Sequence, residues 1–411
     1  MNVKKTFLTT KKVTSAVLMV LSISCAPFAQ AAVSDQAKRI HERLAGVPPS
    51  DAVLASMVTQ LNAGDGVAAA QIAMQNSFFY SSTLKNFVMP WTDSQRSILG
   101  DLNDYVATVI GVTRDDLDFR RILYDDILYT AAGNVATAYS KTDNIHYTEI
   151  ESNFIDMSNP AQLVATTQSS AATLGLPAIE TAGVLTTRQS AKAFMDAGTN
   201  RRLFEYTILN HLCISIEDAN DITRTPDRIR QDVSRNPGGD SSVYLNTCIG
   251  CHTGMDPMIQ AFAYFNYNSD PDIAAIPQDQ LVYEAGTVQA KYLQNPGVFP
   301  LGYVTTNNDW ENYWRAGKNA NLGWAWKEEP NPAVGGILGK GTGPKSLGRE
   351  FAYSKAFASC QVQKVFEAVC LRAPSSPADR TEVSRITDVF DASTYKLKTV
   401  FAETANYCKG N

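Results

Sequence analysis

The sequence predicts a mainly α-helical fold, in which helical bundles flank a central cysteine–histidine motif and a loop-rich aromatic segment with few short strands. Two observations predict the bundles. Apolar residues recur at helical spacing on the N-terminal side, as at Leu54 and Met57, and near the C-terminus, as at Val362 and Val365. A third observation predicts the loops, because residues 259–345 are rich in Tyr, Trp, Asn, Gly and Pro and show little periodicity.

Residues 1–31 form a predicted signal peptide, which we exclude from the fold. Four lysines precede or border an apolar stretch over residues 13–24, and Ala29 and Ala31 supply the small residues of a cleavage site. The stretch is shorter than the ~20 residues that span a bilayer, so no membrane span is expected. An alternative lipoprotein site at Cys25 has a poor recognition sequence. We therefore expect a periplasmic or secreted protein, cleaved near Ala31.

The charge of the chain bears on its partners. The formal net charge is −5, and loss of the four leader lysines makes it −9. A mildly acidic chain without a basic run is not the pattern of a nucleic-acid-binding protein, and nothing favours a membrane surface. We expect no nucleic-acid partner.

Residues 32–131 are predicted to form an N-terminal helical domain. The expected helices cover residues 51–63, 68–79, 94–109 and 115–131. Residues 132–185 are polar, rich in Ser, Thr and Asn, and weakly periodic, so an irregular segment is expected there.

Two further domains complete the predicted organisation. Residues 186–345 carry the cysteine–histidine motif, and they begin with two expected helices over 187–213, parted near Gly198. A short helix is expected over 226–233. Residues 346–411 are predicted to form a C-terminal three-helix domain.

The motif Cys248-Ile249-Gly250-Cys251-His252 is the clearest chemical signal. Two thiols one helical turn apart match the two vinyl groups of a haem, and the imidazole directly after the second thiol ligates the iron. The sequence therefore predicts one covalent haem c, with Cys248 and Cys251 as its thioethers and His252 as the proximal ligand. On this interpretation residues 186–345 form a monohaem cytochrome c-like domain. Export agrees with it, because c-type haem is attached outside the cytoplasm.

Three alternatives compete for the two cysteines. A thioredoxin-like redox pair follows a strand, whereas a polar Gly-Pro turn precedes Cys248. A structural zinc site needs a second pair of ligands, and no histidine follows His252. A plain disulfide leaves His252 unexplained.

The second axial ligand of the iron is open in the sequence. No Met or His follows Met258, and Met258 itself lies too close to His252 on a helix that Pro257 is expected to cut short. His211 is the leading distal candidate, and a hydrogen-bonded helix histidine is its alternative role. Tyr-bound, water-bound or open iron is the remaining alternative. Other upstream candidates are His41, His146, Met89, Met157 and Met195.

Other polar and aromatic residues are candidates for the haem surroundings. Arg228, Arg230 and Arg235 could bind haem propionates, because a guanidinium pairs well with a carboxylate, or they could be exposed surface arginines. The residues that either wall the haem or pack as ordinary core aromatics are Trp310, Trp314, Trp324 and Trp326.

Four further cysteines are expected to pair in an oxidising compartment: Cys213, Cys360, Cys370 and Cys408. Cys360 and Cys370 lie in one expected helix, about 15 Å apart, which is beyond disulfide reach. Two pairings remain. An up-down-up bundle would bring Cys408 nearer to Cys370 than to Cys360, which favours Cys370–Cys408 with Cys213–Cys360.

The motif and its neighbours resemble the secreted planctomycete-type cytochrome c proteins, whose CxxCH domain belongs with conserved domains of unknown function. The resemblance is carried by the CxxCH motif with the following Asp256-Pro257 pair, and by Ala182-Gly183-Val184-Leu185-Thr186. It extends from about residue 180 to residue 410. It implies haem binding and electron transfer.

We therefore expect an exported monohaem cytochrome that exchanges electrons with a redox partner protein. One alternative is a haem enzyme, a peroxidase or oxygenase, with an open iron position. Another is a structural or partner-binding protein whose fold the haem stabilises. The sequence predicts no oligomeric state, redox potential or substrate.

Overall fold

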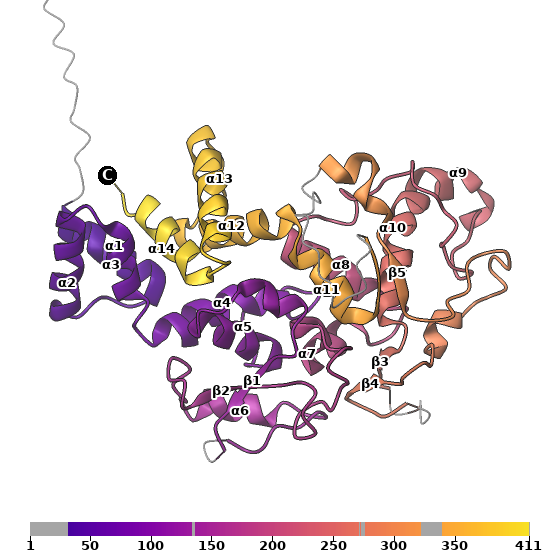
Figure 1. Ribbon diagram of the computed structural model, residues 1–411, viewed down its shortest axis with the longest axis horizontal. Helices are drawn as coiled ribbons and strands as arrows, with labels where there is room; N and C mark the ends of the chain where they lie inside the picture. Colours follow the sequence, from indigo (N-terminus) through magenta and orange to yellow (C-terminus); the bar gives the residue numbers. More distant parts are fainter. Residues whose placement is uncertain (1–31, 134–135, 271, 273–275, 322–338, 411) are drawn as a thin grey trace, which may run out of the picture.

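The computed structural model describes residues 32–133, 136–270, 272, 276–321 and 339–410. The predicted signal peptide, residues 1–31, lies outside these residues. Trp324 and Trp326, two of the predicted haem-wall candidates, also lie outside them. Within them the protein is mainly helical with few short strands, as predicted (Figure 1). In this part of the chain, no helix combines the length and the apolar character that crossing a bilayer requires.

One end of the molecule, called the helical end below, is built from both ends of the chain (Figure 1). Its helices are α1 (Val33–Ala45), α2 (Asp51–Asn62), α3 (Gly66–Ala73), α12 (Lys355–Cys370), α13 (Pro377–Ala392) and α14 (Leu397–Tyr407). Helix α14 packs against α3, and α1 contacts both α12 and α14. Residues 32–131 and 346–411, predicted as separate domains, thus contribute to one apolar core that includes Leu44, Phe79 and Phe401.

The predicted C-terminal helices are confirmed, and their starts follow capping chemistry. Ser376 accepts a hydrogen bond from the backbone N–H of Asp379, whose carboxylate accepts one from the backbone N–H of Ser376. Pro377 occupies the first turn of α13, where its missing N–H costs no hydrogen bond. Ser354 caps α12 in the same way, through the N–H of Phe357.

The middle of the chain departs from the expected helices. A helix was expected over 94–109, but α5 (Asp104–Arg114) begins only where Asn103 caps the N–H of Val106. The helix expected over 115–131 is wrong. That stretch forms a short 3₁₀ turn, Phe119–Leu123, and then strand β1 (Leu128–Ala131).

Strand β1 pairs in antiparallel register with β2 (Leu163–Thr166). This pairing explains why residues 128–131 form a strand instead of the expected helix. Pairing with a strand more than thirty residues away outweighs the local helical preference of 115–131. The segment 132–185, expected to be irregular, contributes β2 and also α6 (Ile145–Ser152). Helix α4 (Lys85–Val88) leads into this middle region.

The other end of the molecule, called the motif end below, carries the cysteine–histidine motif (Figure 1). Its helices are α7 (Arg188–Phe194), α8 (Arg201–Leu212), α9 (Ser241–Val243), α10 (Ile249–Ile259) and α11 (Gly343–Ala352). Its strands are β3 (Phe265–Tyr267), β4 (Leu281–Tyr283), β5 (Asp309–Glu311) and β6 (Lys340–Thr342). β3 pairs with β4 and β5 with β6, each antiparallel. The two helices expected over 187–213 and the short strands are confirmed.

The short helix expected over 226–233 is wrong. The carbonyl of Ile229 accepts a hydrogen bond from the N–H of Tyr303, and the carbonyl of Gln231 accepts one from the N–H of Phe299. Arg235 also donates to the carbonyls of Ile229 and Val233. These carbonyls are thus bound by a distant segment and by a side chain rather than within a helix.

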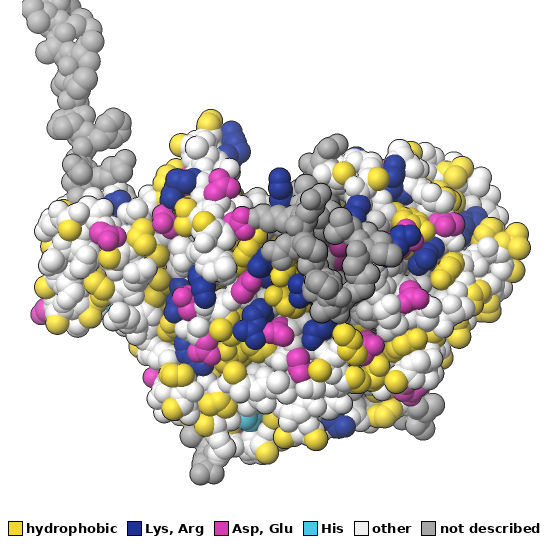
Figure 2. All heavy atoms as spheres, in the orientation of Figure 1, with side chains coloured by type: hydrophobic (Ala, Val, Ile, Leu, Met, Phe, Trp, Pro, Cys, Tyr) yellow, Lys and Arg dark blue, Asp and Glu magenta, His cyan; other side chains and the backbone are white. Residues whose placement is uncertain are grey.

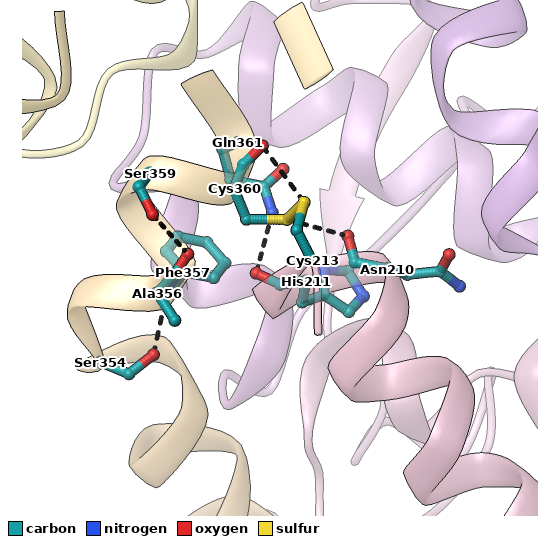
Figure 3. Close-up of a disulfide and its surroundings, with 9 residues drawn as sticks. All are labelled: Asn210, His211, Cys213, Ser354, Ala356, Phe357, Ser359, Cys360 and Gln361. Carbon is teal, nitrogen blue, oxygen red and sulfur yellow. Dashed lines mark hydrogen bonds between the residues drawn. A yellow bond between two sulfur atoms is a disulfide. The ribbon is translucent and has the colours of Figure 1, made fainter. Parts of the chain in front are cut away.

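Two disulfides fasten the fold, and both belong to the pairing that the sequence favoured. Cys370–Cys408 joins α12 to the end of α14, with the Cα atoms 5.5 Å apart. Cys213–Cys360 joins the end of α8 to α12 at a Cα separation of 5.2 Å (Figure 3). The second bridge therefore connects the motif end to the helical end.

On the face shown in Figure 2, acidic and basic side chains are interspersed across the middle of the molecule, with apolar side chains scattered among them. No broad area of a single charge sign dominates the described residues of this view.

Candidate functional site

The two cysteines of the motif lie at the start of α10. A single turn of π-helix, Tyr244–Cys248, leads into this helix, so that Cys251 and His252 fall in its first turn. Both Cys248 and Cys251 are partly buried free thiols, unlike the four cysteines in disulfides. Cys251 Sγ lies 3.4 Å from the carbonyl oxygen of Ile216. The sequence thus brings both predicted thioether positions onto one helical turn.

The thiol environment argues against a reactive redox cysteine. Burial, with Glu217 and Cys248 nearby, raises the pKa of Cys251 to about 11. Reactive cysteines of thioredoxin-like pairs have a lowered pKa, because a positive neighbour or a helix N-terminus stabilises their thiolate.

Two glycines allow neighbouring segments to press closely on α10. A Cβ atom on Gly250 would lie 1.8 Å from Asn220 Oδ1, and one on Gly254 would lie 2.0 Å from the Trp314 ring. Trp314 is fully buried and packs beside Phe204. Trp314 is therefore a core residue that fixes α10.

Pro257 lies inside α10 instead of ending it, contrary to expectation. The helix continues to Ile259, and Met258 is fully buried.

His252 has a fixed orientation. Its Nδ1 atom lies 3.2 Å from Oδ1 of Asp256, one turn further along α10, and the His252 side chain is 19 % exposed while that of Asp256 is 0 % exposed. When Nδ1–H donates to this carboxylate, Nε2 is the nitrogen that remains free to bind a metal. A histidine that ligates a metal commonly donates its other ring N–H to a carboxylate in this way.

A buried cluster of charges holds Asp256 in place. Arg201, in the first turn of α8, donates from Nε to Asp256 Oδ1 at 2.7 Å and from Nη2 to Oδ2 at 3.0 Å. The same guanidinium forms two more hydrogen bonds, of 2.6 and 2.9 Å, to Asp232. Burial would raise the pKa of Asp256, but Arg201, His252 and Arg230 hold that pKa well below its usual range. Asp256 is therefore an ionised acceptor.

The three arginines predicted for haem propionates have different surroundings. Arg228 lies 3.6 Å from a carboxylate oxygen of Glu311, and Arg235 donates to two backbone carbonyls. Arg230 is 0 % exposed, and none of its three guanidinium nitrogens has a hydrogen-bond partner. Its Nε atom lies 3.7 Å from Asp232, and its guanidinium sits over the Tyr292 ring. Of the three, Arg230 has unsatisfied buried donors that a ligand carboxylate would match.

His211, the predicted distal ligand, lies among the core helices. Its Nε2 atom is 2.8 Å from the hydroxyl of Tyr105, and its ring contacts Trp91 edge-on. Its backbone carbonyl accepts a hydrogen bond from Gln361 of α12 (Figure 3). Burial, with Lys364 nearby, lowers the pKa of His211 to about 3. These contacts fit the hydrogen-bonded core histidine that the sequence left as its alternative.

A hollow of about 630 Å³ opens beside the motif. Its lining includes Glu217, Asn220, Ile222 and Lys318. Asn220 faces Gly250 of the motif, and Ile222 is 58 % exposed. The other lining residues are polar, charged or glycine, so the hollow presents hydrogen-bonding groups rather than an apolar patch.

Asp256, Arg201 and Asp232 were not predicted as site residues. The position of Asp256 carried a signal, because a residue four places after His252 lies on the same helix face. Arg201 and Asp232 lie 55 and about 24 residues before Asp256, so no local pattern joins them. Among the described residues, no group of three or more His, Cys, Asp or Glu side chains is placed to hold a metal ion.

Comparisons with protein-family models, with curated proteins and with solved structures found no match for this chain. The resemblance to planctomycete-type cytochromes accordingly stays a prediction.

Proposed function

We propose that this protein is an exported monohaem c-type cytochrome that passes electrons through a haem attached to Cys248 and Cys251 and ligated by His252. The observation that carries the proposal is the hydrogen bond between His252 and Asp256, because it engages Nδ1 and leaves Nε2 as the ring nitrogen of a CxxCH histidine that can bind iron. Two unpaired thiols on the same turn agree with it.

The attachment needs only what the chain and the haem contain. Each thiol adds across one vinyl group: the sulfur bonds to one vinyl carbon and the hydrogen goes to the other, so no oxidant is consumed. When bound, the haem supplies a one-electron iron couple. Arg201 and Asp256 hold the imidazole in place, and the buried Arg230 guanidinium offers free donors to a propionate.

The partly exposed side chain of His252 supports an electron-transfer role, because a haem bound there would lie near the surface. A surface with interspersed charges gives a redox partner protein both polar and apolar contacts. Localisation outside the cytoplasm is proposed with the function, from the leader sequence and the two disulfides.

The test is haem retention in acidified acetone, after expression with a cytochrome-maturation system. The unmodified protein should keep its haem with the precipitated polypeptide, whereas Cys248→Ala/Cys251→Ala should release it. The matched control is Cys370→Ala/Cys408→Ala, which removes two cysteines elsewhere and should keep the haem. Release of haem from the unmodified protein would contradict the proposal.

Electron transfer has its own test. A potentiometric titration of the purified holoprotein should show one reversible one-electron transition. A holoprotein whose iron does not cycle reversibly would favour the structural alternative.

A further inference from the structure

An exposed segment of the motif end, residues 293–304 and called the apolar loop below, carries no charged side chain. The uncharged stretch extends from Tyr292 to Asn308, in a chain of which 19 % is charged. Leu301 is 88 % exposed, and three further large apolar side chains of the loop are nearly half exposed: Leu293, Val298 and Val304. Exposed apolar side chains on one segment without charges indicate a surface that an apolar partner covers.

The apolar loop is fixed to the fold at its base. The N–H of Phe299 donates to the carbonyl of Gln231 at 3.0 Å, and the N–H of Tyr303 donates to the carbonyl of Ile229 at 3.0 Å. Leu301 lies between these two anchored residues. Because the backbone on both sides of Leu301 is held, little conformational freedom is lost when its side chain becomes buried against a partner.

The backbone of the loop fits a medium without water. Two more amides are bonded within the loop, over 3.1 and 2.8 Å: Val298 N–H to the carbonyl of Asn295, and Gly302 N–H to that of Phe299. Pro296 and Pro300 have no N–H group. Most N–H groups of residues 296–303 are therefore bonded within the protein or absent. An unpaired N–H is costly in hydrocarbon, where no water replaces its partner, so this arrangement favours lipid over a partner that binds backbone.

Two arginines lie beneath aromatic rings of the loop. The guanidinium of Arg235 is 4.3 Å from the ring centroid of Phe299, and that of Arg228 is 5.6 Å from the ring centroid of Tyr303. Cations at the base of an uncharged apolar segment match the order of phosphate headgroups and acyl chains in a lipid surface. Arg228 also lies 3.6 Å from Glu311, which weakens its attraction to anionic headgroups. Apolar burial must therefore supply most of the binding.

We propose that the apolar loop inserts Leu301 and its neighbours into a lipid surface, and so holds the motif end at a membrane without a membrane-spanning segment. The net charge of the chain does not indicate this contact, because the attraction comes from apolar burial and not from a basic run. The proposal uses no residue of the cysteine–histidine motif. It is therefore independent of haem attachment.

The first test is sedimentation of the protein without residues 1–31 with vesicles of phosphatidylethanolamine and phosphatidylglycerol. The unmodified protein should sediment with the vesicles, and Leu301→Ser should lower the partition coefficient about tenfold, as expected for one leucine side chain. The matched control is Leu99→Ser, because Leu99 is 94 % exposed but lies between the charged residues Arg96 and Asp101. Both side chains lie mostly in solvent, so both variants should fold. A protein that stays in solution, or equal losses in the two variants, would overturn the inference.

The second test measures depth. In Leu301→Trp the tryptophan emission should shift to shorter wavelength when vesicles are added, and lipids brominated in their acyl chains should quench it. Leu99→Trp is the control and should show neither change. Emission of Leu301→Trp that matches this control would contradict insertion.

A redox partner protein is the competing occupant. If the unmodified protein ignores vesicles but Leu301→Ser binds such a partner more weakly, the loop belongs to a protein interface and the inference is overturned. Release of haem in acidified acetone would contradict the proposed function and leave the lipid contact untouched.

Discussion

The helical end and the motif end are stabilised by different forces. At the helical end Phe79 and Phe87 both meet Phe401 edge-on at an apolar core, and the arginines of the ion pairs, Arg372 and Arg385, are nearly half exposed. At the motif end the partly exposed guanidinium of Arg201 joins the buried carboxylate of Asp256, the partner of His252, to that of Asp232. Apolar packing tolerates substitutions of similar volume, whereas a buried charge cluster fails when one member is lost. The difference indicates that the motif end is built to orient a side chain.

The largest expected effect comes from the covalent bond between the two ends. Cys213–Cys360 closes a sequence separation of 147 residues, and Cys370–Cys408 closes one of 38. Loop-closure entropy predicts losses of about 5 and about 4 kcal/mol for the respective double alanine variants. Guanidinium-induced unfolding of both variants measures which of them loses more free energy of unfolding. A larger loss in Cys370→Ala/Cys408→Ala would show that the bridge between the ends is the less important one.

Two arginines provide a matched comparison of the ends, because each joins two carboxylates. Arg201→Ala removes the guanidinium that pairs with the buried Asp256 and the part-buried Asp232, and should lower the free energy of unfolding by ~3–5 kcal/mol. Arg385, which is 46 % exposed and joins Glu382 to Glu403, should cost at most ~1 kcal/mol when changed to alanine. Denaturant unfolding of the two variants measures the contrast, and similar losses would remove it.

Acid should weaken the protein through His211, which lies between the two ends. Its pKa of about 3 is below the ordinary value of 6.5, so the unfolded chain binds the proton more readily. The contribution of neutral His211 to the free energy of unfolding is complete above pH 6.5. It is lost as the pH falls toward 3, by roughly 3 kcal/mol between pH 7 and pH 4. Unfolding free energies of the unmodified protein and of His211→Gln at both pH values test this. Identical pH dependence in the two proteins would exclude the effect.

The smallest expected effect is local to the helical end. Ser376→Ala removes the cap of α13 and should cost about 1 kcal/mol. Ser375→Ala is the control, since only the backbone carbonyl of Ser375 takes part, accepting from Arg380. Thermal unfolding should separate the two variants, and equal midpoints would mean that the cap contributes nothing.

The helical end could be predicted from sequence because its signals are local. Val362 and Val365 lie on one helix face, and Ser376, Pro377 and Asp379 together announce the start of α13. The same reasoning failed over 115–131, where a strand forms because its partner β2 comes much later in the chain. Periodicity within one segment contains no information about such a partner.

The motif itself could be recognised from the sequence, but the charged residues that hold His252 and Asp256 in place could not. Cys248, Cys251 and His252 are adjacent in sequence and share a helical turn. Asp256 was within reach of the same spacing argument. Arg201, Asp232 and Arg230 meet only after α8 and the loop before α9 have folded against α10. Their side-chain charges predict that these residues are polar, but they do not predict that the three lie close together in the fold.

The most direct test of covalent haem binding is the intact mass of the denatured mature protein, purified from a host that matures c-type cytochromes. We predict the mass of the chain without its leader plus that of one haem, and loss of the added mass from the Cys248→Ala/Cys251→Ala variant. A mature chain that weighs only as much as its amino acids would contradict the proposed haem attachment.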